Sequence, residues 1–379
     1  MFPVEFNRIQ SIENELAPKR VLVVYGPLRI GKTTQLQAFL EKKKNEGKKI
    51  LSVVGDDIGV RDLFASESQN RIMQFAEPWD IIAIDEAQYV PNIGRGAKML
   101  IDAMPEKTII LTGSSSFELS GQVGEPLTGR HFVMTLLPVS VKEIVGGTFI
   151  VENNLSDMLI FGAYPEILLA GNPDKKRRIL FELLSSYLYK DILVLDNIRS
   201  PDRLRDLTRA LALQIGKEVS LSELGRMVSG GMSVKTVARY LDVLEKMFVV
   251  KKVGGWSGNM RNEITRKAKY YFLDLGVRNA VIEQFQSLEY RNDVGALWEN
   301  FVFMELYKKS VREKTEERFY FWRTHAGDEM DIVREHNGIL TGIEAKWGKS
   351  VGVQKKWRIE YPKSAWQCIT RDNFDQYLF

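Results

Sequence analysis

The chain has 379 residues, a formal net charge of +4 and 44% hydrophobic residues. This length is more than one ordinary hydrophobic core accommodates, and it suggests two or three domains. Its single cysteine, Cys368, excludes an internal disulfide and fits a reducing compartment, and only three histidines accompany it, which argues against a structural zinc site. No run approaches the roughly 18 to 20 apolar residues of a membrane span, and the first twenty residues do not form the apolar segment of a secretory signal. We therefore expect a cytoplasmic protein without a membrane partner, whose mild basic bias permits nucleic acid without arguing for it.

The most informative motif is a glycine-rich loop over residues 26–33, which follows the apolar run 21–25 and precedes an amphipathic stretch. Its two glycines let the backbone curl so that successive N–H groups point at phosphate oxygens, and the loop then opens a helix whose N-terminus favours anions. Lys32 is expected to reach the β and γ phosphates, and the Thr33 hydroxyl to coordinate Mg²⁺. The alternative is an ordinary glycine turn, which the flanking strand and helix disfavour. The predicted nucleotide-binding residues are Gly26, Pro27, Leu28, Arg29, Ile30, Gly31, Lys32, Thr33 and Thr34.

A second apolar run, residues 81–86, ends in the two carboxylates Asp85 and Glu86. Asp85 is expected to join the nucleotide site by holding Mg²⁺ through water, and Glu86 to polarise the attacking water. Both roles require a carboxylate at the carboxyl end of a strand beside the phosphate loop. The alternative is a strand that ends in an acidic turn.

Two further polar positions follow downstream. The run 108–116 ends in small hydroxyl residues, and Ser114 is predicted to be a polar sensor near the γ phosphate, with a serine-rich turn as a nearly equal alternative. Arg130 follows Gly129 and is predicted to stabilise transition-state charge, either within the chain or across a subunit boundary. An arginine in that position is otherwise a surface residue.

The spacing of apolar runs divides the chain into four segments. Residues 1–136 alternate short apolar strands with helical stretches, which predicts a parallel sheet covered by helices and a nucleotide-binding module. Residues 137–215 are mostly helical, with a break at 161–166, and show no catalytic constellation. The third segment spans 216–285 and the fourth 286–379.

Residues 216–285 suggest a winged helix-turn-helix. A first helix is expected over 219–228, a turn over 229–232, and a second helix capped by Ser233 and running to about Met247. Its apolar face is expected to hold Val234, Val237, Leu241 and Leu244. Lys235 and Arg239 would then enter a major groove, with a basic hairpin over the phosphates that includes Arg261, Lys267 and Lys269. An equally weighted alternative is a lid or hinge whose charges are merely solvated.

The C-terminal segment holds a second constellation. An amphipathic helix over 297–306 precedes apolar strands at 319–323, 329–333 and 339–347, and Asn337-Gly338 between the last two is a strong hairpin signal. A two-residue turn there places His336 opposite Ile339, and the count along both strands then places Asp331 opposite Glu344 and Glu329 opposite Lys346.

Opposed carboxylates destabilise a sheet unless something binds between them, so a divalent cation is the natural occupant. Asp331, Glu344 and, from the helix, Glu299 are the predicted metal ligands, and Lys346 is predicted to orient or activate water. This set suits metal-assisted phosphodiester hydrolysis. The alternative is a solvent-facing strand pair.

With these motifs together, the sequence resembles a family of prokaryotic AAA-type ATPases that join a P-loop core to a C-terminal domain with a restriction-endonuclease-like fold. The resemblance implies that Lys32, Thr33, Asp85 and Glu86 carry nucleotide binding and hydrolysis, and that Arg130 stands where an arginine finger is expected. It also favours ATP over GTP. Residues 330–332 depart from the family pattern in packing but keep the acid. The resemblance is carried by residues 26–34, 84–86, 111–114, 129–130, 161–166, 298–300, 321–323, 329–331 and 343–346.

The sequence therefore predicts an α/β protein with a parallel-sheet core, a helical linker, a winged helix-turn-helix and a C-terminal α/β domain. The expected function is an ATP- and Mg²⁺-dependent switch or motor whose C-terminal segment binds or cuts DNA or RNA. The alternative is a regulatory ATPase whose later domains are inactive scaffolds for protein contacts. An arginine finger acting in trans would require a homo-oligomer.

Overall fold

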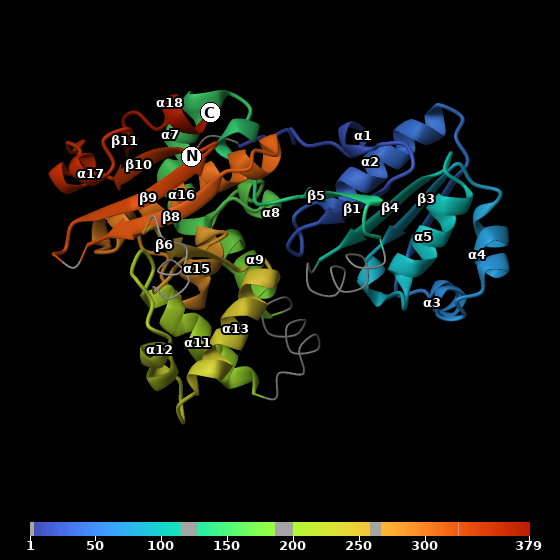
Figure 1. Ribbon diagram of the computed structural model, residues 1–379, viewed down its shortest axis with the longest axis horizontal. Coiled ribbons are helices and arrows are strands. Elements are labelled where there is room, and N and C mark those ends of the chain that lie inside the picture. Colours follow the sequence, from blue (N-terminus) through green and yellow to red (C-terminus); the bar gives the residue numbers. More distant parts are fainter. Residues whose placement is uncertain (1–3, 115–126, 186–199, 258–266, 325) are drawn as a thin grey trace. The chain divides into compact units, whose positions relative to one another are not determined.

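The computed structural model describes residues 4–114, 127–185, 200–257, 267–324 and 326–379. The chain forms two compact units, which are described separately below (Figure 1). The smaller unit consists of residues 8–137 and 246–248. The larger unit consists of residues 1–7, 138–245 and 249–379. None of the described helices combines the length and the apolar character that a membrane crossing needs.

The smaller unit is built on a five-stranded parallel sheet in the order β2-β3-β4-β1-β5, as the sequence predicts for this segment. Its strands are β1 Val21–Tyr25, β2 Ile50–Val54, β3 Ile81–Asp85, β4 Thr108–Gly113 and β5 His131–Thr135. Its helices are α1 Ile12–Glu15, α2 Lys32–Asn45, α3 Ile58–Ala65, α4 Gln69–Ala76, the 3-10 turn η1 Ala87–Tyr89 and α5 Ile93–Ala103. The central strands are buried on both faces because helices cover both.

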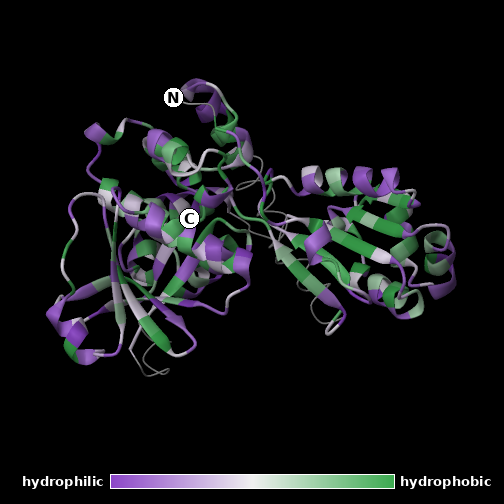
Figure 2. Cartoon of the chain, turned by 90° about the horizontal axis from the view of Figure 1, so that it is seen from above, coloured by the Kyte–Doolittle hydropathy of each residue, from purple (hydrophilic) through white to green (hydrophobic). Residues whose placement is uncertain are grey.

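Successive apolar residues of each strand point to opposite faces of this sheet. Val23, Ile84 and Leu111 pack against apolar residues of α3, α4 and α5, whereas α1 and α2 lie on the other side in Figure 1. Figure 2 shows these strands mostly in the hydrophobic colour. The core thus fixes the strand ends, and with them the loops that follow β1, β3 and β4.

The larger unit is built on a six-stranded mixed sheet in the order β11-β10-β9-β8-β6-β7. Its strands are β6 Val250–Gly255, β7 Lys269–Phe272, β8 Arg318–Arg323, β9 Glu329–His336, β10 Ile339–Lys346 and β11 Ala365–Thr370. Its longer helices are α7 Gly147–Phe161, α9 Pro173–Leu183, α11 Pro201–Leu213, α12 Leu221–Met227, α13 Val234–Lys246, α15 Leu275–Val281 and α16 Val294–Glu313. Its shorter helices are α8 Pro165–Leu168, α17 Lys355–Glu360 and α18 Asp375–Leu378, and its 3-10 turns are η3 Val141–Glu143 and η5 Leu288–Tyr290.

The helices expected over 219–228 and from 234 to about 247 both form, as α12 and α13. Ser233 caps α13, since its Oγ accepts the Thr236 N–H at 3.2 Å. Val237, Leu241 and Leu244 are buried as expected, whereas Val234 is half exposed. The β6–β7 pair follows, but β6 also pairs in parallel with β8. The strands of the expected wing therefore belong to the sheet of the C-terminal segment, and the boundary expected at residue 285 lies within one unit.

Candidate functional site

The first candidate site lies at the carboxyl end of β1, where the glycine-rich loop leads into α2. Gly31 is the residue before the helix and has a φ of +98°, and no side chain caps the first turn, so its backbone N–H groups are available to an anion. Gly26 has a φ of +154°, and a Cβ there would lie 2.4 Å from the carbonyl oxygen of Leu136. Both glycines are therefore required by the backbone of the loop.

Lys32 lies inside this loop. Its Nζ donates to the carbonyl oxygens of Gly26 at 2.9 Å and Pro27 at 3.0 Å, and the side chain is buried. Burial lowers the pKa of Lys32 from 10.5 to about 8, although the charges of Glu86 and Asp85 oppose the change. A buried ammonium held only by carbonyl dipoles fits a polyphosphate ligand, because phosphate would supply the missing negative charge.

The acidic end of β3 lies beside this lysine. Asp85 accepts a hydrogen bond from Thr33 Oγ1 at 2.7 Å and another from the Thr112 hydroxyl. An aspartate and a threonine hydroxyl in contact are a donor set that suits Mg²⁺. Glu86 follows with a left-handed backbone at φ +52°, and its carboxylate accepts from the Gln88 amide. The structure thus brings Lys32, Thr33, Asp85 and Glu86 together, as the sequence predicts.

Ser114 is held indirectly. It accepts from Gln88 Nε2 at 3.1 Å, so one amide contacts both Glu86 and Ser114. Thr112 also accepts the Glu86 N–H at 3.2 Å. Sequence reasoning missed Gln88 and Thr112. Thr112 could have been found as a polar residue within the buried part of the 108–116 run. Gln88 could have been found as an amide two residues after the acidic pair.

Arg130 lies elsewhere. It precedes β5, its carbonyl oxygen accepts the Val21 N–H at 2.9 Å, and the parallel register pairs Val21 with His131. It therefore lies at the amino edge of the sheet, about 13 Å along β1 from the phosphate loop at a strand rise of about 3.3 Å per residue. Its guanidinium contacts Asp102 at 2.6 Å. Of the two alternatives predicted for Arg130, action within its own chain does not fit this position, because parallel strands carry their amino ends away from the phosphate edge.

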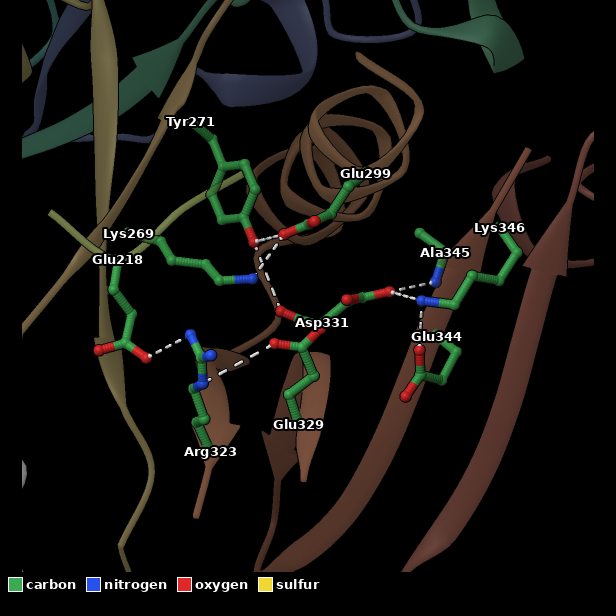
Figure 3. A network of polar contacts seen from close by, with 10 residues as sticks. All are labelled: Glu218, Lys269, Tyr271, Glu299, Arg323, Glu329, Asp331, Glu344, Ala345 and Lys346. Atoms are coloured by element: carbon green, nitrogen blue, oxygen red, sulfur yellow. Dashed lines mark hydrogen bonds and ion pairs between the residues drawn. The ribbon is translucent and has the colours of Figure 1, made fainter. Parts of the chain in front are cut away.

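The second candidate site lies in the larger unit, on β9 and β10. The hairpin register is as predicted at His336–Ile339 and continues to Ile332–Ile343, which brings Asp331 beside Glu344. Lys346 Nζ contacts Asp331 Oδ2 at 2.8 Å and Glu344 Oε2 at 2.6 Å, and Asp331 also accepts the Ala345 N–H at 3.0 Å (Figure 3). Glu329 instead lies beside Arg323, at 4.0 Å.

Burial and the charge of Asp331 raise the pKa of Glu344 to about 7. Burial alone would lower the pKa of Lys346, but the two carboxylates outweigh it and hold that pKa above its ordinary value. Asp331 and Glu344 thus share one bridging ammonium, and Glu344 titrates near neutral pH. We call these three residues the carboxylate centre.

Glu299 does not join this centre as a third ligand. Its Oε1 accepts from Lys269 Nζ at 2.8 Å and from the Tyr271 hydroxyl at 2.7 Å, and Figure 3 shows its carboxylate directed toward these two side chains. Among the residues that the structure describes, no group of three or more histidine, cysteine, aspartate or glutamate side chains is arranged to hold a metal ion. The predicted three-carboxylate ligand set is therefore not assembled, because β7 brings Lys269 against Glu299.

The predicted nucleic-acid residues are surface residues where they are described. Lys235 and Arg239 are exposed on α13, and Lys267 is exposed just before β7. Arg261 lies outside the described residues.

Residues 18–145 match a family described as an AAA domain. Residues 152–288 and 294–361 match two families described as domains of unknown function. The match over 18–145, together with the phosphate loop and its parallel sheet, shows that this part of the chain is an AAA-type P-loop ATPase module.

Curated relatives are uncharacterised. A Mycobacterium tuberculosis protein is 27% identical over 351 residues, covering 89% of this chain and 73% of its own length. A Methanocaldococcus jannaschii protein is 25% identical over 355 residues, covering 87% and 76%. Solved structures include the replication initiator DnaA bound to AMPPCP and single-stranded DNA, at 18% identity and a TM-score of 0.31, covering 62% of this chain and 84% of that one. AMPPCP-bound DnaA from Aquifex aeolicus covers the same shares at 17% identity and a TM-score of 0.30.

Proposed function

Because residues 18–145 form an AAA-type ATPase module, we propose that the protein is an ATP-hydrolysing switch or motor whose larger unit binds nucleic acid. The observation that carries the ATP half is the contact of Thr33 with Asp85 beside the buried ammonium of Lys32. The nucleic-acid half is supported by a basic surface on the larger unit, described below.

In the ATP half, the loop N–H groups and Lys32 bind the polyphosphate, and Thr33 and Asp85 would hold Mg²⁺. Bound Mg²⁺ neutralises charge that develops on the phosphate oxygens. Glu86 then accepts a proton from the attacking water. Gln88 holds the Glu86 carboxylate and the Ser114 hydroxyl at once, so it couples the position of the base to the end of β4. Arg130 is proposed to act only in trans, in a homo-oligomer, since its own phosphate edge is out of its reach.

The basic surface is the segment 349–363, which contains α17. It carries five basic residues against the one acid Glu360. All five are exposed, and none of them forms an ion pair with any residue in the described part of the chain. The five are Lys349, Lys355, Lys356, Arg358 and Lys363. Trp357 is buried and anchors α17 to the sheet, so the three cations on this helix, Lys355, Lys356 and Arg358, face outward on a fixed element. Uncompensated cations in such density favour a phosphate backbone.

The carboxylate centre bears on cleavage. Asp331, Glu344 and Lys346 lie together, but two carboxylates bridged by an ammonium do not form a metal site as they stand. The engagement of Glu299 by Lys269 favours a second candidate, a regulatory ATPase whose larger unit is catalytically inactive and contacts protein.

The deciding experiment measures Mg²⁺-dependent ATP hydrolysis with and without single-stranded DNA, duplex DNA or RNA, and follows the nucleic acid for cuts in the same tubes. We expect hydrolysis that nucleic acid raises several-fold and that Lys32→Ala abolishes, because the phosphate contact is lost. Any cleavage should disappear in Glu344→Ala. A rate that is indifferent to every nucleic acid, with no cuts, would favour the regulatory candidate, and unchanged ATP affinity in Lys32→Ala would contradict the nucleotide site.

A further inference from the structure

A cavity of about 810 Å³ lies in the larger unit, on the side of Glu299 away from the carboxylate centre. Three stretches line it: 216–218 before α12, the start of β7, and the β8–β9 strand ends. We propose that this cavity binds one unpaired nucleotide of a single-stranded nucleic acid. This proposal rests on the nucleic-acid partner proposed above.

The charges of the lining point to an anion. Arg323 lies between Glu218 at 3.3 Å and Glu329 at 4.0 Å, so its single charge offsets part of the charge of the two wall carboxylates (Figure 3). The rim lysines Lys217 and Lys267 are exposed and form no ion pair with any residue that the structure describes. An anionic group at the rim would therefore meet two uncompensated ammonium groups.

The accessible lining of the cavity is mainly polar. Phe321, Trp322 and Met330 belong to the lining but are each no more than 3% exposed, so they offer a ligand little apolar surface. A polar cavity with a cationic rim suits a nucleoside phosphate, whose base carries hydrogen-bonding groups on its edges and whose phosphate is charged. The volume lies within the range of roughly 300 to 1,000 Å³ that holds small organic ligands.

The position of the cavity connects it to the carboxylate centre. Lys269 lines the cavity and contacts Glu299, and the Tyr271 hydroxyl that also contacts Glu299 lies 3.4 Å from the carbonyl oxygen of Asp331. Tyr271 and Glu299 are buried, so the connection between the cavity and Asp331 runs through these side chains. A duplex cannot present a base in this way without unpairing it, which costs a few kcal/mol. The cavity therefore selects single strands.

The test measures binding of a fluorescent single-stranded oligonucleotide and of its duplex to the full-length protein by anisotropy. We expect at least tenfold tighter binding of the single strand, and at least tenfold weaker single-strand binding in Lys217→Glu/Lys267→Glu. The matched control is Lys142→Glu/Lys175→Glu, which makes the same charge change at two exposed lysines of the larger unit and should bind within twofold of the unaltered protein. Thermal unfolding checks that each variant folds, and glutamine at both rim positions replaces glutamate if it does not.

The outcomes separate the cavity from the proposed function. If the protein binds nucleic acid but the rim variant binds equally well, or if duplex and single strand bind alike, the cavity proposal is overturned and the nucleic-acid partner stands. If no nucleic acid binds, both fall. The last measurement is competition of the bound oligonucleotide with cytidine monophosphate. If that mononucleotide binds with the same affinity as the single strand, the occupant of the cavity is a free nucleotide and the single-strand proposal is overturned.

Discussion

At the scale of single residues, burial decides the chemistry of Lys32. The loop supplies two carbonyl dipoles in place of water, and they compensate the ammonium only in part, so its pKa falls to about 8 despite Asp85 and Glu86. At pH 8 about half of these lysines are neutral in the nucleotide-free protein. The unfolded chain keeps its proton up to about pH 10.5, so the free energy of unfolding should rise with pH between about 8 and 10.5.

Nucleotide binding should therefore take up protons. A polyphosphate beside Lys32 raises its pKa again, and we expect an uptake of about half a proton per nucleotide at pH 8 and close to none at pH 6.5. Calorimetric titration with AMPPCP in buffers of different ionisation enthalpy measures this number. Lys32→Arg is the control, because arginine stays protonated throughout. Equal uptake in that variant would assign the proton to another group.

At the scale of elements, Asp274 explains the break at residues 161–166. It caps α15 by accepting the Val277 N–H at 3.1 Å, and it also accepts the Ala163 N–H at 2.7 Å, just past the end of α7. Gly162 has a φ of +80°, and a Cβ there would lie 2.0 Å from Asp274 Oδ1. One buried carboxylate thus joins two helices, which is why a glycine stands at this junction.

Asp274→Asn should destabilise the larger unit by about 2 to 4 kcal/mol, because the amide places a donor where the carboxylate accepts and leaves a buried N–H without a partner. Urea unfolding measures the shift. Asp174→Asn is the matched control, since Asp174 is exposed and forms only a surface ion pair with Arg177, and its effect should stay within about 0.5 kcal/mol. An Asp274→Asn protein as stable as the unaltered chain would contradict this role.

At the scale of the whole molecule, the net charge of +4 hides an uneven distribution. Many charged side chains on the sheet of the larger unit form ion pairs, such as Lys346 with Asp331 and Glu344, and Arg323 with Glu218. The segment 349–363 is not balanced in this way. Nucleic-acid binding should accordingly depend on this surface and on the cavity rim rather than on overall charge.

Lys355→Ala/Lys356→Ala/Arg358→Ala should therefore weaken binding and its salt dependence together. If each cation neutralises one phosphate of a single strand, the slope of log K against log salt should fall in magnitude by about 2. Anisotropy titrations between low and moderate salt give the slope. Lys142→Ala/Lys175→Ala should leave it unchanged. An unaltered slope in the triple variant would exclude α17 from the interface.

Local signals in the sequence determined much of this protein. The phosphate loop, the acidic end of β3 and the helix capped by Ser233 each depend on residues that are neighbours in the chain. The Asn337-Gly338 turn likewise fixed the register that brings Asp331 to Glu344, because a two-residue hairpin leaves one alignment of its strands.

Only the tertiary structure decided which distant residues meet. Lys269 reaches Glu299, and the expected wing joins the C-terminal sheet, because β6 pairs with β8 across more than sixty residues of chain. Arg130 is carried to the far edge of its sheet by the parallel pairing of β1 with β5, and Thr112 reaches Asp85 because β4 lies between β1 and β3. Strand order between distant segments is set by the packing of whole faces, and no short motif encodes it.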